Sequence, residues 1–328
     1  MSGSRRQVLI NAGLLCAGAV LPIAAARAQS DWPTRPVRLI IPFPPGGPTD
    51  MVARVLAAQL SEQLGQQVIP ENRAGANGNI GGELVAHAPA DGYTLLYNTS
   101  SIVLSRSLYA KLGYDLFKDL TPVAMVASIP MVLAVNPSIP AKNFAEFVAL
   151  LKAQPDKYSY GSPGNGNVGH LASALILKAT GTQAVHVPYK GSAPALTDTA
   201  SGQVSFMTDS ANSILPFIKD RRLRPLAVTS TKRLDAIPET PTLEELGLKG
   251  VEVGVWQGVL APAATPEALV QRLNAEINKA LANPAVASKL ATQSAIVRKT
   301  TPAEYGEYLR SEADRWGKVF KEVGIQPE

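Results

Sequence analysis

The fold is decided by the stretch Val37-Arg38-Leu39-Ile40-Ile41-Pro42-Phe43-Pro44-Pro45-Gly46-Gly47-Pro48-Thr49-Asp50. Its first five residues are mostly branched and apolar, which predicts a buried strand, and the proline- and glycine-rich turn ends that strand. Apolar residues then recur at helical spacing from Thr49 to Leu64. A strand, a tight turn and a helix in this order form the repeating unit of α/β folds.

The same alternation continues along the chain. Further strands are predicted at Gln67–Ile69, Thr94–Tyr97, Met131–Val135, Tyr158–Tyr160, Val185–Val187, Val204–Met207 and Leu226–Thr229. Further helices are predicted at Ile80–His87, Phe144–Lys152 and Val168–Ala179, and the C-terminal part is predicted to be mostly helical. Strands that alternate with helices predict an α/β fold with mainly parallel sheets.

Two glycine-rich turns divide this pattern into halves. Each half begins with strands and carries one strand-to-helix turn, at Pro44–Thr49 and at Gly161–Asn167. We therefore expect two lobes that face each other across a cleft lined by helix N-termini. In the C-terminal part, Thr265-Pro266 and Thr301-Pro302 each predict a capped helix start, and Glu304 completes a capping box with Thr301.

The N-terminus is typical of an exported protein. Arg5 and Arg6 precede an uncharged run from Ala12 to Ala26, and Ala26-Arg27-Ala28 has the small-x-small pattern of a cleavage site. We therefore predict a cleaved signal peptide at residues 1–28 and a periplasmic mature protein. The paired arginines favour the twin-arginine route. An uncleaved membrane anchor is the alternative, and it is disfavoured because a span needs about 20 apolar residues.

Composition excludes several classes of protein. Cys16 is the only cysteine, so cleavage leaves no disulfide, no thiolate nucleophile and no Cys-ligated zinc. The formal net charge is +5, and because residues 1–28 hold three arginines and no acid, the mature chain carries only +2. That value argues against a nucleic-acid-binding protein, which would carry a clustered basic face. The sequence shows no metal-spaced histidines and no Walker A motif, and we expect neither a metal nor a cofactor.

The first turn is suited to an anion. If Pro48 occupies the first helical position, Gly47 is the N-cap, and the glycines leave backbone N–H groups uncovered. A helix start concentrates unpaired donors and partial positive charge, so it attracts an anion without any Arg or Lys. Asp50 lies in the first helical turn, where we interpret it as a structural cap in preference to a catalytic base.

The second turn, Gly161 to His170, contains Gly164-x-Gly166-x-x-Gly169 between a strand and a helix. That spacing fits a dinucleotide fingerprint, but the next strand ends without the acid that would hold a ribose. The turn fits a small anion better. A hydrolase that uses Ser162 and His170 is an alternative, although the sequence has no Gly-x-Ser-x-Gly elbow and no acid evidently placed to orient the histidine.

Taken together, these turns resemble the solute receptors of tripartite tricarboxylate transporters, also called Bug proteins. The resemblance runs across nearly the whole mature chain. Its motifs, in order, are Trp32-Pro33, Arg35-Pro36, Pro42 to Asp50, Glu71-Asn72-Arg73-Ala74-Gly75-Ala76-Asn77-Gly78, Asp91-Gly92-Tyr93-Thr94-Leu95-Leu96, Tyr160 to Gly166 with His170, Val187-Pro188-Tyr189-Lys190-Gly191, Trp256-Gln257-Gly258 and Ala261-Pro262.

The resemblance implies a type II periplasmic binding protein, a two-lobed Venus flytrap with two mixed sheets whose cores are mainly parallel. Lobe 1 would comprise residues 29–128 and 230–328, and lobe 2 residues 129–229. It implies no catalysis, and it implies a monomer that closes on a small carboxylate and delivers it to membrane transporter subunits. The implied ligand contacts are Phe43, Gly47, Pro48, Thr49, Asp50, Ser100, Ser101, Ser162, Gly164, Asn165, Asn167, His170 and Asp209.

Two other functions stay open on the sequence. One is the exported serine hydrolase, and the other is a sensor that binds the same ligand but passes the complex to a signalling protein. Few Arg or Lys residues lie in the motifs. We therefore expect a mono- or dicarboxylate in preference to a tricarboxylate.

Overall fold

The structure is a computed structural model that describes residues 32–155, 157–325 and 327. The predicted signal peptide and its paired arginines lie outside the described residues. The strands are β1 (Val37–Ile41), β2 (Val68–Asn72), β3 (Thr94–Thr99), β4 (Leu120–Val135), β5 (Ser159–Ser162), β6 (Val185–Pro188), β7 (Phe206–Ser210), β8 (Arg224–Val228), β9 (Gly254–Pro262) and β10 (Ile296–Val297).

Helices cover both faces of the strands. They are α2 (Pro48–Leu64), α3 (Asn79–Ala86), α4 (Ser101–Leu108), α5 (Phe144–Ala153), α6 (Val168–Thr180), α7 (Ser192–Ser201), α8 (Ala211–Lys219), α9 (Glu267–Ala282), α10 (Pro284–Ala291) and α11 (Pro302–Glu322), with the short 3₁₀ helix η1 (Ala76–Gly78) before α3. Over the described ranges, none of them combines the length and apolar character that a bilayer crossing requires.

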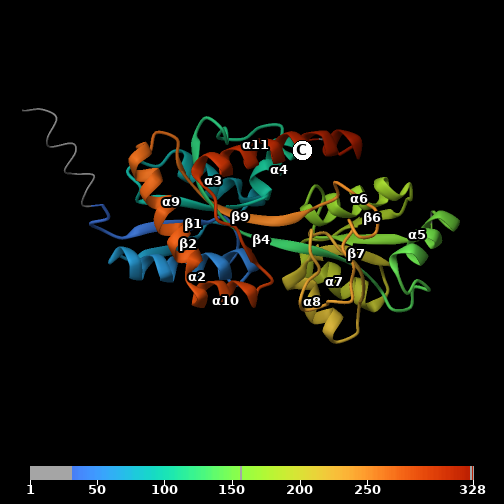
Figure 1. The fold of residues 1–328 in the computed structure, drawn as a ribbon. Coiled ribbons are helices and arrows are strands. Elements are labelled where there is room, and N and C mark those ends of the chain that lie inside the picture. The colour runs from blue at the N-terminus through green and yellow to red at the C-terminus, as the bar shows by residue number, and fades with distance from the viewer. Residues whose placement is uncertain (1–31, 156, 326, 328) are drawn as a thin grey trace, which may run out of the picture.

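The strands form one mixed, continuous sheet in the order β2-β1-β3-β9-β4-β7-β5-β6, with β10 and β8 also paired to β4. The pairs β1–β2, β1–β3, β5–β6 and β5–β7 are parallel, whereas β4 and β9 pair antiparallel with their neighbours. Figure 1 shows β4 and β9 running between two lobes, each with its own helices. The predicted α/β fold with two lobes is therefore confirmed, and the two mixed sheets expected from the sequence are joined into one through β4 and β9.

The long strand β4 connects the two lobes. From Leu120 to Pro130 it pairs with β9, and from Met131 to Val135 it pairs with β7 and β8. The sequence predicts only its last five residues, Met131–Val135, because Pro122 and Pro130 interrupt the apolar run, and prolines are expected only at strand edges and bulges. The register of β4 indeed shifts between Pro122 and Ala124. Strand β9 is missed altogether, so the prediction of a mostly helical C-terminal part is incomplete.

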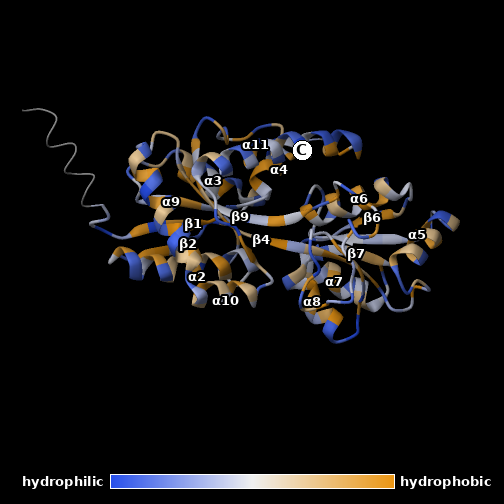
Figure 2. Cartoon of the chain, viewed as in Figure 1, coloured by the Kyte–Doolittle hydropathy of each residue, from blue (hydrophilic) through white to orange (hydrophobic). Residues whose placement is uncertain are grey.

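Buried apolar side chains form three clusters between the sheet and the helices, and Figure 2 shows hydrophobic residues on strands and helices of both lobes. In the first lobe, α2 and α9 cover one face of the sheet in one buried cluster, and α11 covers the other face in a second cluster that includes Trp256 and Trp316. A third cluster, with Phe147 and Phe206, fills the second lobe. Because burial of such side chains is the main favourable term in folding, these clusters fix the strand ends that carry the predicted contacts.

The segment between β8 and β9 packs against the second lobe. Leu243 and Val251 belong to the cluster that contains Phe147 and Phe206. Leu243 N also donates a hydrogen bond to Val228 O, at the end of β8. These contacts favour a lobe boundary near Gly254. The division at residues 128/129 and 229/230 stays a prediction.

The helix starts test the capping predictions. Helix α2 begins at Pro48 with Gly47 as its N-cap, and α11 begins at Pro302 with the full Thr301–Glu304 capping box, as predicted. The prediction for Thr265 is wrong, because α9 begins at Glu267 with Pro266 as its cap and no side-chain capping bond. The Thr265 hydroxyl is buried without a hydrogen-bond partner.

Candidate functional site

The predicted contacts gather at strand ends that the sheet brings toward one crossover. Because β1 and β3 are parallel, the turns after them share an edge of the sheet, and the same holds for β5 and β7. Gln257 of β9 pairs with both Thr99 and Ala127, while Ser210 pairs with Met131. The ends of β3 and β7 therefore approach the same short stretch of β4, one from each lobe.

The first turn leaves its helix start uncapped. Gly47 has extended backbone angles (φ −77, ψ 168) and makes no side-chain capping bond to α2. Thr49, only 9% exposed, and Asp50, 2% exposed, occupy the positions after Pro48. The first N–H groups of a helix have no acceptor within the helix. This start can therefore present its N–H donors and its partial positive charge to an anion.

Asp50 braces the first turn. Its carboxylate accepts hydrogen bonds from Gly46 N at 2.9 Å, Arg54 Nε at 2.8 Å and Asn72 Nδ2 at 2.8 Å. Burial raises the pKa of Asp50, but hydrogen bonds from Arg54, Gly46 and Asn72 outweigh it, so the pKa is lowered overall. The charged Asp50 thus holds the backbone in place, which fits a structural cap.

Asn72 extends this bracing to Phe43, the first residue of the predicted contact set. Besides Asp50, Asn72 Nδ2 donates to Phe43 O at 2.9 Å. The Phe43 ring is half-buried and lies beside Gly78, where a Cβ would come within 3.5 Å of Phe43 Cζ. Asn72 is absent from the predicted contacts, although a polar residue at the end of a strand could have been predicted to lie near the site.

The end of β3 holds buried polar groups with unmet hydrogen bonds. Asn98 Oδ1 accepts from Tyr305, and Gln257 Oε1 accepts from Tyr97 at 2.7 Å, yet Asn98 Nδ2 and Gln257 Nε2 have no partner. The Ser100 hydroxyl is also buried without a partner. Buried polar groups are normally paired, since an unpaired one costs about 1–3 kcal/mol. Ser101 is placed differently, because its hydroxyl is bonded to Thr99 at 3.0 Å.

The second turn is closed by its own side chains. Asn167 is the N-cap of α6 and accepts from Gly169 N at 3.0 Å. Gly164 and Gly166 both have positive φ, which a residue with a side chain adopts only with strain. A Cβ on Gly166 would lie 2.7 Å from Leu108 Cδ1, so this turn touches the first lobe. Asn165 is exposed on its outer side.

Ser162 pairs with His186 and not with His170. The Ser162 hydroxyl lies 2.7 Å from His186 Nε2 and donates to Gly164 O at 3.1 Å. His170 Nδ1 instead accepts from Gly166 N at 3.1 Å. The pairing proposed for the hydrolase alternative is therefore not formed.

The two histidines stack on one another inside the second lobe. Their ring centroids are 3.7 Å apart and the rings are nearly parallel, and Tyr160 also stacks on His186, with centroids 4.9 Å apart. Burial lowers the pKa of His170 to about 3, with a further contribution from His186, and burial lowers that of His186 to about 4. Both rings are thus neutral at physiological pH, and they give the second turn polarity without charge.

Asp209 is a predicted contact whose carboxyl group has a strongly shifted pKa. It is 3% exposed, and its Oδ1 accepts from Ser210 N at 2.7 Å. Burial raises its pKa to about 6, although hydrogen bonds from Ser192 and Ser210 lower it in part. Its Oδ2 has no partner of good geometry, even though Ser192 is near enough to affect the pKa. A buried acid of this kind suits a ligand that brings a hydrogen-bond donor.

The described residues show no arrangement for metal chemistry at this site. Within the described part of the chain, no group of three or more His, Cys, Asp or Glu side chains is placed to bind a metal ion.

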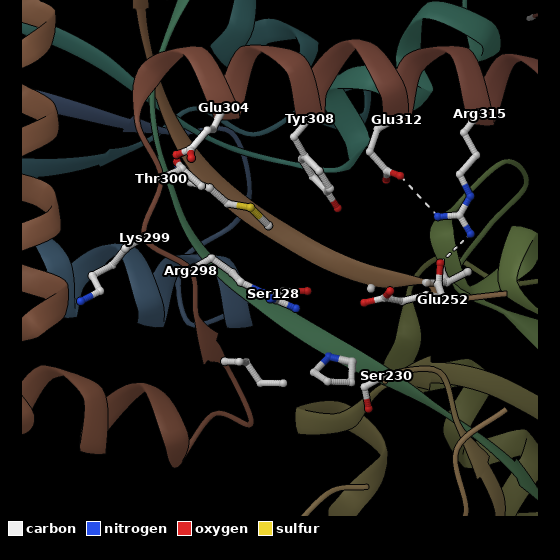
Figure 3. A pocket seen from close by; sticks show the side chains of 15 residues that line it. Ser128, Ser230, Glu252, Arg298, Lys299, Thr300, Glu304, Tyr308, Glu312 and Arg315 are labelled. Atoms are coloured by element: carbon white, nitrogen blue, oxygen red, sulfur yellow. Dashed lines mark hydrogen bonds and ion pairs between the residues drawn. The ribbon is translucent and has the colours of Figure 1, made fainter. Parts of the chain in front are cut away.

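A pocket of about 430 Å³ lies beside the crossover strands, between α11 and residues 252–254, and none of the predicted contact residues lines it (Figure 3).

Comparison with known proteins gives consistent matches. The tripartite tricarboxylate transporter family receptor matches residues 52–325. A protein of Pseudomonas sp. (strain P51), encoded in the tcbD-tcbE intergenic region, is 40% identical over 322 residues, which cover 98% of this chain and 95% of that protein.

Solved structures agree in fold and length. A protein of R. palustris with adipate has a TM-score of 0.81 at 38% identity, covering 90% of this chain and 100% of that one. The periplasmic binding protein BugD has a TM-score of 0.77 at 34% identity, covering 90% and 100%. MatC of Rhodopseudomonas palustris, with bound malate, has a TM-score of 0.75 at 32% identity, covering 88% and 99%.

Proposed function

This chain belongs to the tripartite tricarboxylate transporter receptor family, and we propose that it captures a small organic carboxylate between its two lobes and delivers it to a tripartite tricarboxylate-type membrane transporter. The observation that carries the proposal is the uncapped start of α2, where Gly47 leaves the first N–H donors without a side-chain acceptor. Such a start favours an anion.

The solved relatives support this class of ligand. One was solved with adipate and another with malate, and both are dicarboxylates. Buried donors with unmet hydrogen bonds lie at the same edge of the sheet in this chain, on Asn98, Ser100 and Gln257. A carboxylate brings acceptors that such donors require.

The proposed contacts come from both lobes. They are Phe43, Gly47, Pro48, Thr49, Asp50, Ser100, Ser101, Ser162, Gly164, Asn165, Asn167, His170 and Asp209, to which we add Asn98 and Gln257. Within this set, Asp50 and Asn167 act through the backbone that they brace, since their side-chain oxygens accept hydrogen bonds from the backbone N–H groups of Gly46 and Gly169. A mono- or dicarboxylate fits better than a tricarboxylate, because the set contains no Arg or Lys.

The receptor function is favoured over both alternatives. The family consists of solute receptors and not of enzymes, and the Ser162 hydroxyl is 0% exposed and bonded to a neutral histidine. A sensor would bind the same ligand, so it differs only in its partner, and the transporter is the partner that the family implies. Receptors of this family are periplasmic, and we propose that residues 1–28 are the cleaved export signal of this chain.

A thermal-shift screen against carboxylates tests the proposal. The panel contains adipate, malate, citrate and acetate, with adipamide as the uncharged match to adipate. A ligand at 100 times its dissociation constant stabilises the folded state by about 2.7 kcal/mol. We expect a clear rise in melting temperature with at least one mono- or dicarboxylate and none with adipamide. If no carboxylate raises the melting temperature while an ester is hydrolysed by the protein and not by Ser162→Ala, the hydrolase function is correct instead.

A further inference from the structure

The pocket of about 430 Å³ in Figure 3 has walls from both lobes. On one side stand Arg298, whose backbone N bonds to Val126 O of β4, and Tyr308 of α11. On the other side stands Glu252, next to Val251, which is packed into the core of the second lobe. A molecule bound here would contact both lobes at the crossover.

Two of the acidic groups in the pocket are already satisfied. Glu312 accepts from the indole N–H groups of Trp256 at 3.1 Å and Trp316 at 2.9 Å, and Arg315 lies 3.3 Å from its other oxygen. Glu304 accepts from Thr301 N at the start of α11. Glu312 therefore has partners on both of its oxygens, and Glu304 is held through Oε2 by the N-cap of its own helix.

Three charged side chains that line the pocket have no partner in the described part of the chain, and Figure 3 shows one of them, Lys299, pointing away from the other two. Among the described residues, the side chains of Arg298 and Glu252 form no hydrogen bond and no ion pair. Figure 3 shows them pointing toward one another across the pocket, with the Tyr308 hydroxyl directed into the same space. Burial, with Glu312 and Glu252 nearby, raises the pKa of Tyr308, so its hydroxyl stays a hydrogen-bond donor.

The same pocket has an apolar wall. Met125, Val253 and Ile296 line it, and Ile296 is 41% exposed, one of the few large apolar side chains so exposed in the described part of the chain. Covering such a side chain with an aliphatic group would remove apolar surface from water.

We propose that this pocket is a second binding site, for an α-amino acid with an aliphatic side chain. The ligand carboxylate meets Arg298 and the Tyr308 hydroxyl, its ammonium group meets Glu252, and its side chain covers Met125 and Ile296. A simple carboxylate would leave Glu252 unpaired and a simple amine would leave Arg298 unpaired, whereas a zwitterion satisfies both. The site lies outside the proposed carboxylate contacts and does not depend on them.

Calorimetric titration with L-leucine tests the site. We expect saturable one-to-one binding that weakens about tenfold or more in both Arg298→Gln and Glu252→Gln, because each removes a charged hydrogen bond. The matched controls, Lys152→Gln and Glu267→Gln, alter exposed charges outside the pocket and should bind L-leucine as the wild type does. The double variant Arg298→Glu with Glu252→Arg should recover binding, since the zwitterion can reverse its direction.

Two results would overturn the proposal. One is the absence of saturable heat with L-leucine at millimolar concentration in a protein that unfolds cooperatively. The other is L-leucine binding that survives both pocket variants and is lost in Gly47→Asp, which would place the ligand at the start of α2. The second result would leave the proposed carboxylate function intact, so the two proposals fail separately.

Discussion

The two glycine-rich turns look alike in sequence but differ in how their helices begin. Gly47 caps α2 without a side chain, and the bracing residue Asp50 bonds to the turn from inside the helix. Asn167 caps α6 with its own side chain, and Ser162 and His170 are bonded within the turn. The first turn therefore keeps the N–H donors of its helix start available, whereas some N–H donors of the second turn are bonded to side chains of the same turn.

This difference assigns separate tasks to the turns. We expect the first turn to supply most of the hydrogen bonds to an anion, and the second to supply a rigid, uncharged surface that completes the site. The neutral histidine stack fits that second task, because a charged ring would be costly in a buried position.

The largest expected effect comes from breaking the brace of the first turn. Asp50→Ala removes the acceptor of Gly46 N, Arg54 Nε and Asn72 Nδ2. We expect a loss of about 2–4 kcal/mol in the free energy of unfolding, measured with urea, because a buried charged acceptor is lost. Carboxylate affinity should fall about tenfold or more, since the loop that carries the donors loosens.

Asp50→Asn separates charge from shape in this test. The amide keeps the size of the side chain and part of its hydrogen bonding, so its effect should be smaller. The pKa of Asp50 is lowered in the folded protein. Its contribution is therefore present above the unfolded pKa and lost as the pH falls through the folded pKa. An Ala variant as stable as the wild type would contradict the bracing role.

The second turn should be less sensitive. Ser162→Ala removes the group that bonds to His186 Nε2 at 2.7 Å. We expect a loss of about 1–2 kcal/mol in the free energy of unfolding and a carboxylate affinity within about threefold of the wild type, equivalent to less than 1 kcal/mol. A drop in affinity as large as that of Asp50→Ala would show that both turns grip the ligand equally.

The histidine stack predicts a pH dependence of stability. The pKa values of His170 and His186 are lowered by burial to about 3 and about 4. As the pH falls below the unfolded value, the unfolded chain takes up protons that the folded chain excludes, so stability decreases until those folded pKa values are reached. We expect His186→Gln to reduce the slope of the free energy of unfolding against pH, measured with urea between pH 6 and pH 4.

Asp209 acts in the opposite direction in the same experiment. Burial raises its pKa to about 6, so the folded state binds the proton of Asp209 more tightly than the unfolded state does. The contribution of Asp209 to the free energy of unfolding is therefore lost as the pH rises through that value. Asp209→Asn should therefore make the acid loss of stability steeper. An unchanged slope in both variants would exclude these groups as its cause.

The smallest expected effect is on the cap of α6. Asn167→Gly removes the side chain that accepts from Gly169 N and makes this turn resemble the first one. Because glycine is a tolerated cap, the free energy of unfolding should fall by only a few tenths of a kcal/mol, whereas Asn167→Ala should cost about 1 kcal/mol. Equal losses in the two variants would mean that Asn167 contributes more than its cap.

Local patterns were enough to predict most of the fold and both turns. The start of α2 at Gly47 and Pro48, the box at Thr301 and the alternation of strands and helices are set by neighbours in sequence. Strand β9 was missed because Gly254 and Gly258 interrupt its apolar run, and residues 120–130 of β4 were missed because Pro122 and Pro130 do the same there. A long antiparallel pairing stabilises them despite weak local preference.

Long-range contacts could not be predicted in the same way. Ser162 is bonded to His186, 24 residues away, and Asn98 to Tyr305, 207 residues away. The sequence pointed to His170 because it is nearer along the chain, and it gave no reason to single out Gln257 as a buried donor. Such pairs are created by strand order and register, which local periodicity does not contain.

If the uncapped start of α2 holds a carboxylate, an acceptor placed at Gly47 must weaken its binding, and titration calorimetry on two substitutions of Gly47 measures this. A Cβ at Gly47 would meet only Pro44 O at 3.7 Å, so both Gly47→Asp and Gly47→Ala fit. The aspartate would cap the helix itself, which should raise the free energy of unfolding by a few tenths of a kcal/mol relative to glycine, and it would compete with the ligand. We predict that Gly47→Asp weakens binding of the best carboxylate in the panel about tenfold or more, while Gly47→Ala, which adds no acceptor, binds within about threefold of the wild type. Wild-type affinity in Gly47→Asp would show that the start of α2 does not hold the carboxylate.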